Sequence, residues 1–360
     1  MKIYKINLYP LKSGVVIVEI NSDNGFTGIG QFIGNSYISQ KYYFKERLEK
    51  ILINKKIDIE NIWNELYWNG LGKNGWLQVI SAIDIALYDL VSKSKKLPLY
   101  KFLKLKKKKN IKLYWSIGHG FKKTIKEMQL KIDIGLKLGF KAFKIRMDWH
   151  ELRQDIDLVK DYQMLKAVRS MLPKNFYLGF DANAGYSVKA AIRQGKKFED
   201  LGGIGHFEEP IASNNLFGLR EVVKSLKIPI SFGEYEKLAV RFKEVLAISK
   251  PDIIQPDILN IGGITQMIKL FEFLKKNKTK VMPHSPDIGV LSFASLQLAD
   301  KYDKDLPHEF SPELYNYNIS EHAKIFEQDI IPKNGIIDLD RNSPGIGLSI
   351  NKKELKKLII

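Results

Sequence analysis

The chain has 360 residues, 44% of them hydrophobic, no cysteine and a formal net charge of +18 at pH 7. This length suffices for one large core and a smaller domain, and the absence of cysteine excludes disulfides and thiolate metal sites. The sequence opens with strand-like alternation instead of an apolar signal segment, and no apolar run could cross a membrane, so we expect a cytoplasmic protein without a membrane partner.

The positive charge is compatible with nucleic-acid binding. Most lysines, however, are spread over expected helices as on solvated surfaces, and the one dense run, from Lys104 to Lys109, has the character of an exposed loop between domains. A positive field would equally attract an anionic substrate. We therefore expect no nucleic-acid partner, and a non-catalytic basic binding protein is kept only as an alternative hypothesis.

The N-terminal residues alternate in the way typical of antiparallel strands. We expect these strands at 2–8, 14–20 and 28–32. The Asp23-Asn24-Gly25 sequence between two of them is a strong hairpin signal. Helical periodicity follows at 42–51, 57–67 and 76–93. We place an N-terminal α+β domain at residues 1–110.

A different pattern begins at residue 111, where apolar strand-like runs alternate with helical segments up to about residue 325. The first strand is expected at 111–117, and the clear helices at 124–138, 152–171, 188–201, 215–226, 238–247, 264–276 and 293–299. Alternation sustained over this length predicts a parallel sheet closed into a (β/α) barrel at residues 111–325. The turn-rich tail, 326–360, is expected to return to the N-terminal domain.

Charged side chains stand at the C-terminal edges of successive apolar runs in this region, and from Asp181 onward they recur about every 25 residues. In chain order these positions are Lys144-Ile145-Arg146, Asp181-Ala182-Asn183, Glu208-Glu209-Pro210, Gly233-Glu234, Pro256-Asp257, Pro283-His284 and His308-Glu309. The C-terminal ends of barrel strands meet at one face, where barrel enzymes carry their chemistry. The pattern therefore predicts an active site at that face.

Three acids on consecutive expected strands, Asp181, Glu208 and Glu234, can converge on one point above the barrel. Any one of them alone would more commonly cap a loop. Three carboxylates that leave open coordination positions suit a hard cation, Mg²⁺ before Mn²⁺. We therefore predict one such metal ion per subunit at this point.

Together these motifs resemble the enolase superfamily, and within it the mandelate racemase branch. The resemblance covers nearly the whole chain and extends to the segment 81–89 before the barrel and to Ile261-Gly262-Gly263 after Asp257. It implies an α/β fold with a modified TIM barrel, (β/α)7β, in which the last helix is altered and an N-terminal α+β domain caps the mouth. It also implies an essential Mg²⁺.

By position, the resemblance implies that Asp181, Glu208 and Glu234 bind the metal. It further implies that Asp257 and His284 form a dyad in which the carboxylate orients the imidazole and raises its basicity, so that the histidine titrates near the operating pH. His284 is then the base that removes a proton α to the substrate carboxylate, which gives an enediolate.

Lys144 is expected to contact the substrate carboxylate as a fixed cation. Glu309 is similar to the family's acid that hydrogen-bonds the enolate oxygen, for which its carboxyl must be protonated or share a proton. Arg146 departs from the racemases of this branch, which are expected to carry a second lysine there. A guanidinium with a pKa above about 12 is a poor proton carrier. Two-base racemisation is therefore disfavoured, whereas elimination requires only that His284 return its proton to the departing β-hydroxyl.

The residues thus favour a hydro-lyase, a dehydratase that converts a sugar acid to a 2-keto-3-deoxy acid. The expected substrates are aldonates such as gluconate, galactonate or arabinonate. A racemase or epimerase of a 2-hydroxy acid, using the same enolisation chemistry, is kept as the alternative. The candidate substrate-binding residues are Lys144, Arg146, Asn183, His119 and Tyr37. Self-association into a homo-oligomer is expected by default.

Overall fold

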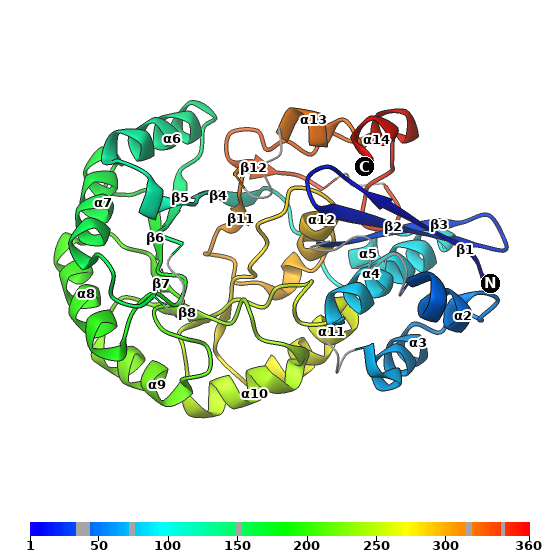
Figure 1. Ribbon diagram of the computed structural model, residues 1–360, viewed down its shortest axis with the longest axis horizontal. Helices are drawn as coiled ribbons and strands as arrows, with labels where there is room; N and C mark the ends of the chain where they lie inside the picture. Colours follow the sequence, from blue (N-terminus) through cyan, green and yellow to red (C-terminus); the bar gives the residue numbers. More distant parts are fainter. Residues whose placement is uncertain (34–43, 72–75, 149–152, 314–318, 340–342) are drawn as a thin grey trace.

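The structure, a computed structural model, describes residues 1–33, 44–71, 76–148, 153–313, 319–339 and 343–360. Figure 1 shows two regions side by side: a curved parallel sheet with helices around its outer side, and a smaller unit in which an antiparallel sheet lies against helices. Both ends of the chain lie in or beside the smaller unit. The N-terminal part of the chain therefore forms that unit and the central part forms the larger one.

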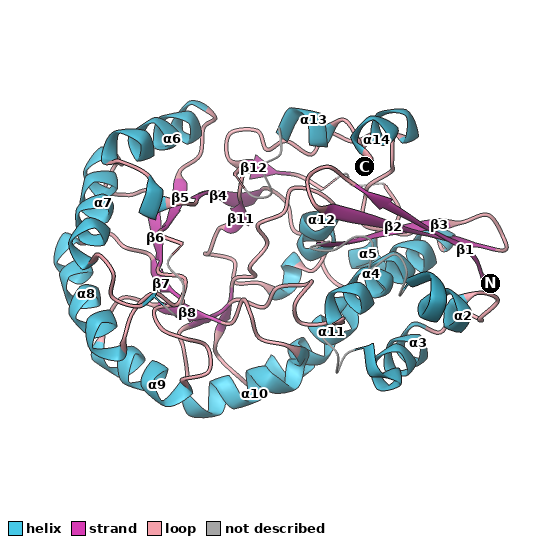
Figure 2. Ribbon diagram, viewed as in Figure 1, coloured by secondary structure: helices cyan, strands magenta, loops and turns pink. Residues whose placement is uncertain are grey.

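The N-terminal sheet is antiparallel with the order β1-β2-β3, as the alternating sequence predicts. Its strands are β1 (Ile3–Pro10), β2 (Val15–Ser22) and β3 (Thr27–Ile33). The elements that follow are η1 (Phe44–Leu48), α2 (Glu49–Leu52), α3 (Ile59–Leu66), η2 (Tyr67–Leu71), α4 (Leu77–Ser94) and α5 (Leu99–Phe102). The long helix α4 packs on the sheet (Figure 2). Most side chains of α4 are buried.

Two glycines of β3 allow α4 to approach the sheet closely. A Cβ atom on Gly30 would lie 1.8 Å from the carbonyl oxygen of Ala82, and one on Gly28 would lie 2.0 Å from that of Ala86. Both carbonyls belong to α4, so a larger residue at either position would push the helix off the strand. The glycines therefore fix the position of α4, which carries one of the residues that line the cavity described below.

The central part of the chain alternates strands and helices. The strands are β4 (Ile111–Ile117), β5 (Ala142–Arg146), β6 (Tyr177–Asp181), β7 (His206–Glu208), β8 (Ile230–Phe232), β9 (Ile253–Ile254), β10 (Lys280–Val281) and β11 (His308–Phe310). The helices are η3 (Gly120–Lys122), α6 (Ile125–Lys137), α7 (Leu158–Met171), α8 (Val188–Leu201), α9 (Leu216–Ser225), α10 (Leu238–Ile248), α11 (Gly263–Leu274), α12 (Val290–Leu296) and η5 (Ala299–Lys301). Within the described ranges, no helix is both long and apolar enough to cross a membrane.

The parallel strands pair in the order β10-β9-β8-β7-β6-β5-β4-β11, so the last strand lies beside the first. Among the described residues no ladder joins β10 to β11, but the N–H of Asp303 donates to the carbonyl of Val281 across this gap (2.9 Å). The expected fold class, a modified (β/α) barrel with an N-terminal α+β cap, is confirmed.

Helix α7 starts later than the sequence predicts, and the C-terminal segment returns to the N-terminal unit. The helix expected at 152–171 begins later, at Leu158, because the side chain of Asp157 accepts a hydrogen bond from the N–H of Lys160 and caps α7 there. The chain closes with α13 (Ile319–Ala323), β12 (Ile336–Ile337) and α14 (Lys352–Leu358). The N–H of Ile360 donates to the carbonyl of Pro10 (3.0 Å), so the C-terminus lies against the N-terminal sheet.

Candidate active site

Strand pairing brings the predicted site residues to one face of the barrel. In the parallel ladders Arg146 pairs with Asp181, and Asp181 pairs with Glu208. Glu234 follows β8 and His284 follows β10, at the same ends of strands in the same sheet. Residues that are far apart in the sequence therefore become neighbours, as the position of each one after an apolar run predicts.

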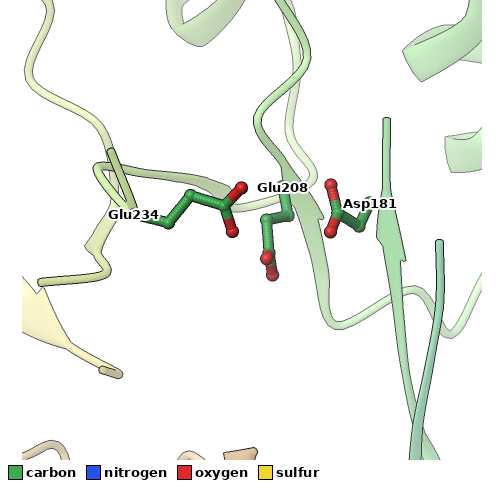
Figure 3. Close-up of side chains that lie close together, drawn as sticks. All are labelled: Asp181, Glu208 and Glu234. Atoms are coloured by element: carbon green, nitrogen blue, oxygen red, sulfur yellow. The ribbon is translucent and has the colours of Figure 1, made fainter. Parts of the chain in front are cut away.

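The carboxylates of Asp181, Glu208 and Glu234 form a buried cluster in which ligand atoms all lie within 4.8 Å of one another. Figure 3 shows Asp181 and Glu234 extending toward Glu208 from opposite sides. The backbone N–H and the side-chain Nδ2 of Asn183 donate to the two oxygens of Asp181 (2.8 and 3.0 Å), which fixes its orientation. Three convergent carboxylates are a donor set that suits a hard divalent cation.

The pKa values of the cluster show how strongly its charges interact. Burial raises the pKa of Asp181 well above its usual range, and the charge of Glu208 raises it further. Burial likewise raises the pKa of Glu234, although the charge of His284 opposes this. Burial would also raise the pKa of Glu208, but the charge of Lys144 and the hydrogen bond from His206 together outweigh burial and hold this pKa well below its usual range. A divalent cation would relieve the repulsion among the three acids, so the donor set fits a metal ion electrostatically as well as chemically.

Lys144 lies among these acids. Its Nζ is 2.5 Å from Oε1 of Glu208, 3.1 Å from Oε1 of Glu309 and 3.7 Å from Oδ2 of Asp181. Burial would lower the pKa of Lys144, but the charges of Glu208 and Glu309 raise it well above its usual range, so the amine stays charged. The side chain has no exposed surface and does not line the cavity described below. It therefore joins buried acids in this structure, where the sequence led us to expect a contact with the substrate.

His284 and Asp257 form the predicted pair. Nδ1 of His284 lies 2.7 Å from Oδ2 of Asp257, whose other oxygen accepts hydrogen bonds from the N–H groups of Leu259 and Asn260 (2.7 and 2.9 Å). Nε2 of His284 is 3.2 Å from Oε2 of Glu234. Burial would lower the pKa of His284, but the charge of Glu234, among others, raises it to about 10. Asp257 thus orients the ring, and Nε2 is the nitrogen directed at the carboxylate cluster.

The sequence led us to expect that the carboxyl of Glu309 carries or shares a proton, whereas its pKa in the structure favours the ionised form. Burial would raise its pKa, but the charges of Lys144 and His284 outweigh burial and lower it. Its Oε2 lies 3.8 Å from Nε2 of His284 and accepts a hydrogen bond from the N–H of Ser285 (3.2 Å). The group is therefore a carboxylate in this arrangement, because two cations lie beside it.

Arg146 lies on the opposite side of Asp181 from Glu208 in the sheet and lines the cavity. Its Nη1 is 3.5 Å from Oδ1 of Asp148. Burial would lower the pKa of Arg146, but the charges of Asp148 and Asp181 raise it above its usual value. The guanidinium is a permanent cation here, in agreement with its expected inability to carry protons.

A cavity of about 890 Å³ opens next to these groups, which is a suitable size for a small molecule. Five predicted residues line it: Arg146, Asn183, Glu234, Asp257 and His284. The other polar lining residues are Gln78, Asp148, Ser213, Tyr235, Lys237, Asn260, Ser285 and Asp287. Apolar side chains, among them Ile33 of β3, complete the wall. The cavity therefore lies between the barrel mouth and the N-terminal unit.

The three substrate-binding candidates outside this catalytic group have different outcomes. Asn183 lines the cavity, although its amide is already engaged with Asp181. His119 is not on the lining: its side chain is 52% exposed, and its Nδ1 lies 3.6 Å from Oδ2 of Asp148. The backbone of His119 is left-handed (φ +55°), and η3 begins at the next residue. Tyr37 lies outside the described residues.

Several lining residues were not predicted from the sequence. Gln78 lies on α4 and Asn260 follows β9, and their side chains are joined by a hydrogen bond (2.9 Å) that links the N-terminal unit to the barrel. Lys237 and Tyr235 follow the predicted Glu234 by a few residues. For Lys237 and Tyr235, closeness to Glu234 is the only feature of the sequence that could have indicated a place in the site. Nothing in the sequence near Gln78 distinguishes it from other polar residues on a helix.

The fold and the arrangement of the site define a member of the mandelate racemase/muconate lactonizing enzyme family, within the enolase superfamily. The family model for the mandelate racemase/muconate lactonizing enzyme N-terminal domain matches residues 11–103, and the enolase C-terminal domain-like model matches residues 131–354. The chain belongs to this family, as the motifs at the strand ends predict.

Individual relatives are similar over most of the chain. It is 28% identical to an arabinonate dehydratase of Saccharolobus solfataricus, over 93% of this chain and 88% of the relative. It is 31% identical to an L-talarate/galactarate dehydratase of Salmonella typhimurium, over 75% of this chain and 67% of the relative. A solved mandelate racemase/muconate lactonizing protein of Paracoccus denitrificans, complexed with magnesium, superposes with a TM-score of 0.90 at 27% identity, covering 100% of this chain and 98% of that one.

Proposed function

We propose that this chain is a Mg²⁺-dependent hydro-lyase that dehydrates a sugar acid, an aldonate such as arabinonate, gluconate or galactonate, to its 2-keto-3-deoxy acid. The observation that carries the proposal is the position of Nε2 of His284, 3.2 Å from Glu234 of the three-carboxylate cluster and on the same cavity. The relatives named arabinonate dehydratase and L-talarate/galactarate dehydratase support this class of reaction.

In the proposed reaction His284 is the base and then the acid. Among the charges that raise the pKa of His284, that of Glu234 is the largest, so neutralising it with a bound cation would favour the neutral ring. With Nδ1–H directed at Asp257, the neutral imidazole accepts at Nε2 the proton from the carbon next to the substrate carboxylate. The electron pair of that C–H bond forms an enediolate. C2 is the carbon next to the carboxylate, and C3 carries the hydroxyl that leaves. When the enediolate collapses, its electron pair forms the C2=C3 double bond, the C3–O bond breaks, and His284 gives its proton to the departing hydroxyl. Water and an enol are released, and the enol tautomerises to the ketone.

The other charged residues bind the metal ion and the substrate carboxylate. We propose that Asp181, Glu208 and Glu234 hold the Mg²⁺. When bound, the ion supplies positive charge that stabilises the enediolate oxygens and offsets the charge of Glu234 beside His284. Arg146 is a largely buried cation on the cavity lining, and we assign it to bind the substrate carboxylate.

Lys144 and Glu309 have proposed roles next to these groups. Lys144 keeps Glu208 ionised from a distance of 2.5 Å, and it is close enough to the cluster to add to the positive field felt by the substrate. Glu309 lies 3.8 Å from Nε2 of His284, so its carboxylate stabilises the imidazolium that forms when the proton is taken up.

A screen of sugar acids tests the proposal. We expect at least one aldonate to give a 2-keto-3-deoxy acid, measured by a colorimetric assay for the keto acid. Activity should disappear after dialysis against EDTA and return with Mg²⁺, because the carboxylate cluster alone does not provide the positive charge. A complete panel without product in saturating Mg²⁺, or turnover that EDTA leaves unchanged, contradicts the proposal.

One observation favours a second candidate, a racemase or epimerase of a 2-hydroxy acid. Lys237 follows Glu234 and lines the same cavity, so an amine is present that could serve as a second base. Turnover in D₂O distinguishes the two reactions. We expect keto-acid product and no accumulation of inverted substrate, whereas deuterium at C2 of substrate with inverted configuration, detected by NMR, would establish the second candidate.

A further inference from the structure

A set of buried polar side chains lies behind Glu208 and is not used by the proposed chemistry. Nε2 of His206 is 3.0 Å from Oε2 of Glu208, and Nε2 of Gln255 donates to the same oxygen (2.8 Å). His206 and Gln255 have no exposed surface. The hydroxyl of Tyr177 lies 2.7 Å from Nδ1 of His206 and extends the set away from the cluster.

The barrel provides a specific space for the His206 ring. Gly179 of β6 pairs with His206 of β7, and a Cβ atom on Gly179 would lie 2.1 Å from Cε1 of the ring. Any other residue at position 179 would therefore displace the imidazole. Because side chains alternate along a strand, His206 and Glu208 project from the same side of β7. The ring is held beneath the carboxylate by both strands.

These contacts also define the direction of each hydrogen bond. A carboxylate only accepts, so Nε2 of His206 carries the proton that is donated to Glu208. In the neutral ring Nδ1 is then an acceptor, and the hydroxyl of Tyr177 is its donor. Tyr177 thus selects the tautomer that can donate to Glu208.

The hydrogen bonds leave Glu208 little capacity for other partners. Each carboxylate oxygen has about two lone-pair positions. Oε2 accepts from His206 and Gln255, which uses both, while among the described residues Oε1 accepts from Lys144 only. One position, on Oε1, is left for a ligand.

We infer that His206 and Gln255 are positioning residues that restrict Glu208 to monodentate binding of a metal ion through Oε1. The inference rests on the proposed function, in which Glu208 is a metal ligand. Mg²⁺ requires near-octahedral coordination and commonly takes one oxygen from each carboxylate, whereas Ca²⁺ takes more ligands and often binds carboxylates through both oxygens. Occupying Oε2 with two donors therefore favours Mg²⁺ over Ca²⁺.

Metal binding to the full chain, measured by isothermal titration calorimetry with Mg²⁺ and separately with Ca²⁺, tests the inference without relying on turnover. In His206→Leu we expect the affinity for Mg²⁺ to fall by about 10-fold to 100-fold. The affinity for Ca²⁺ should fall less, because Oε2 becomes available to it. His206→Gln retains a side-chain N–H donor and should recover most of the preference for Mg²⁺.

Gln255→Met provides the same test if His206→Leu does not fold, since it removes the other donor to Oε2 and leaves the ring in place. Unchanged affinities and an unchanged Mg²⁺/Ca²⁺ ratio in a folded His206→Leu or Gln255→Met variant would overturn the inference. Asp181→Asn separates this from a failure of the proposed metal site. If Asp181→Asn loses Mg²⁺ binding while the other variants bind normally, the metal site stands and only the positioning role is wrong.

Discussion

His284→Asn is expected to lower kcat by about 1,000-fold or more, because it removes the group that both takes and returns the proton. Asparagine can still donate a hydrogen bond toward Asp257 but has no basic nitrogen in place of Nε2. The three acidic side chains assigned to the metal are unchanged, so Mg²⁺ affinity should be close to that of the unaltered protein. Turnover of the substrate identified in the screen and calorimetric titration with Mg²⁺ measure the two quantities separately.

His308→Gln is the matched control for this variant. His308 is a buried histidine of β11 that does not line the cavity. Being next to Glu309 in the strand, it projects from the opposite side of β11, where its ring packs on Tyr302 at 5.2 Å between centroids. We expect its kcat to stay within a few-fold of the original. Retained turnover in His284→Asn, or an equal loss in both variants, would refute the assignment of the base.

Asp181→Asn is expected to abolish Mg²⁺ binding at millimolar metal and, with it, turnover. The same substitution should make the metal-free protein more stable near neutral pH. The pKa of Asp181 is raised in the folded chain, so its ionisation reduces stability as the pH rises from its unfolded value, about 4, toward the raised folded value. Asparagine is neutral at every pH and avoids this loss.

Thermal unfolding with and without Mg²⁺ measures both effects. An ion that binds only the folded chain stabilises it by about 2.7 kcal/mol at one hundred times its Kd, so the original protein should show a clear rise in Tm that Asp181→Asn lacks. Asp84→Asn is the control. Asp84 is another buried acid, and burial raises its pKa to about 7. It lies outside the site, where it accepts a hydrogen bond from the hydroxyl of Thr265. Its Tm should still rise with Mg²⁺. A normal Mg²⁺ response in Asp181→Asn would contradict its role as a ligand.

Much of the catalytic group was predictable because it depends on local sequence. Asp257 and His284 each follow a short apolar run, and parallel pairing of those runs necessarily brings their ends to the same face. Asp181, Glu208 and Glu234 likewise stand at the ends of short apolar runs, so their convergence could be predicted in the same way. The local sequence thus determines which residues come together at the barrel mouth, provided that the sheet closes into a barrel.

The ionisation of the site was less predictable. Glu309 was expected to carry or share a proton and Lys144 to contact the substrate, but the structure places the two side chains 3.1 Å apart. Their mutual attraction, together with the charge of His284, lowers the pKa of Glu309. The pKa of such a group depends on the distances between charged side chains of different strands. The sequence does not give these distances.

The order of residues by itself determined the family, the barrel and its cap, and the strand ends at which the acids and the histidine stand. Tertiary structure alone decided which further side chains line the cavity beside the predicted ones. Ile33 and Gln78 reach it because β3 and α4 pack against helices α12 and α11 of the barrel, whereas the half-exposed side chain of His119 lies outside the lining. The physical reason is that strand periodicity is a local property of the chain, while the docking of one unit on another depends on packing between distant segments.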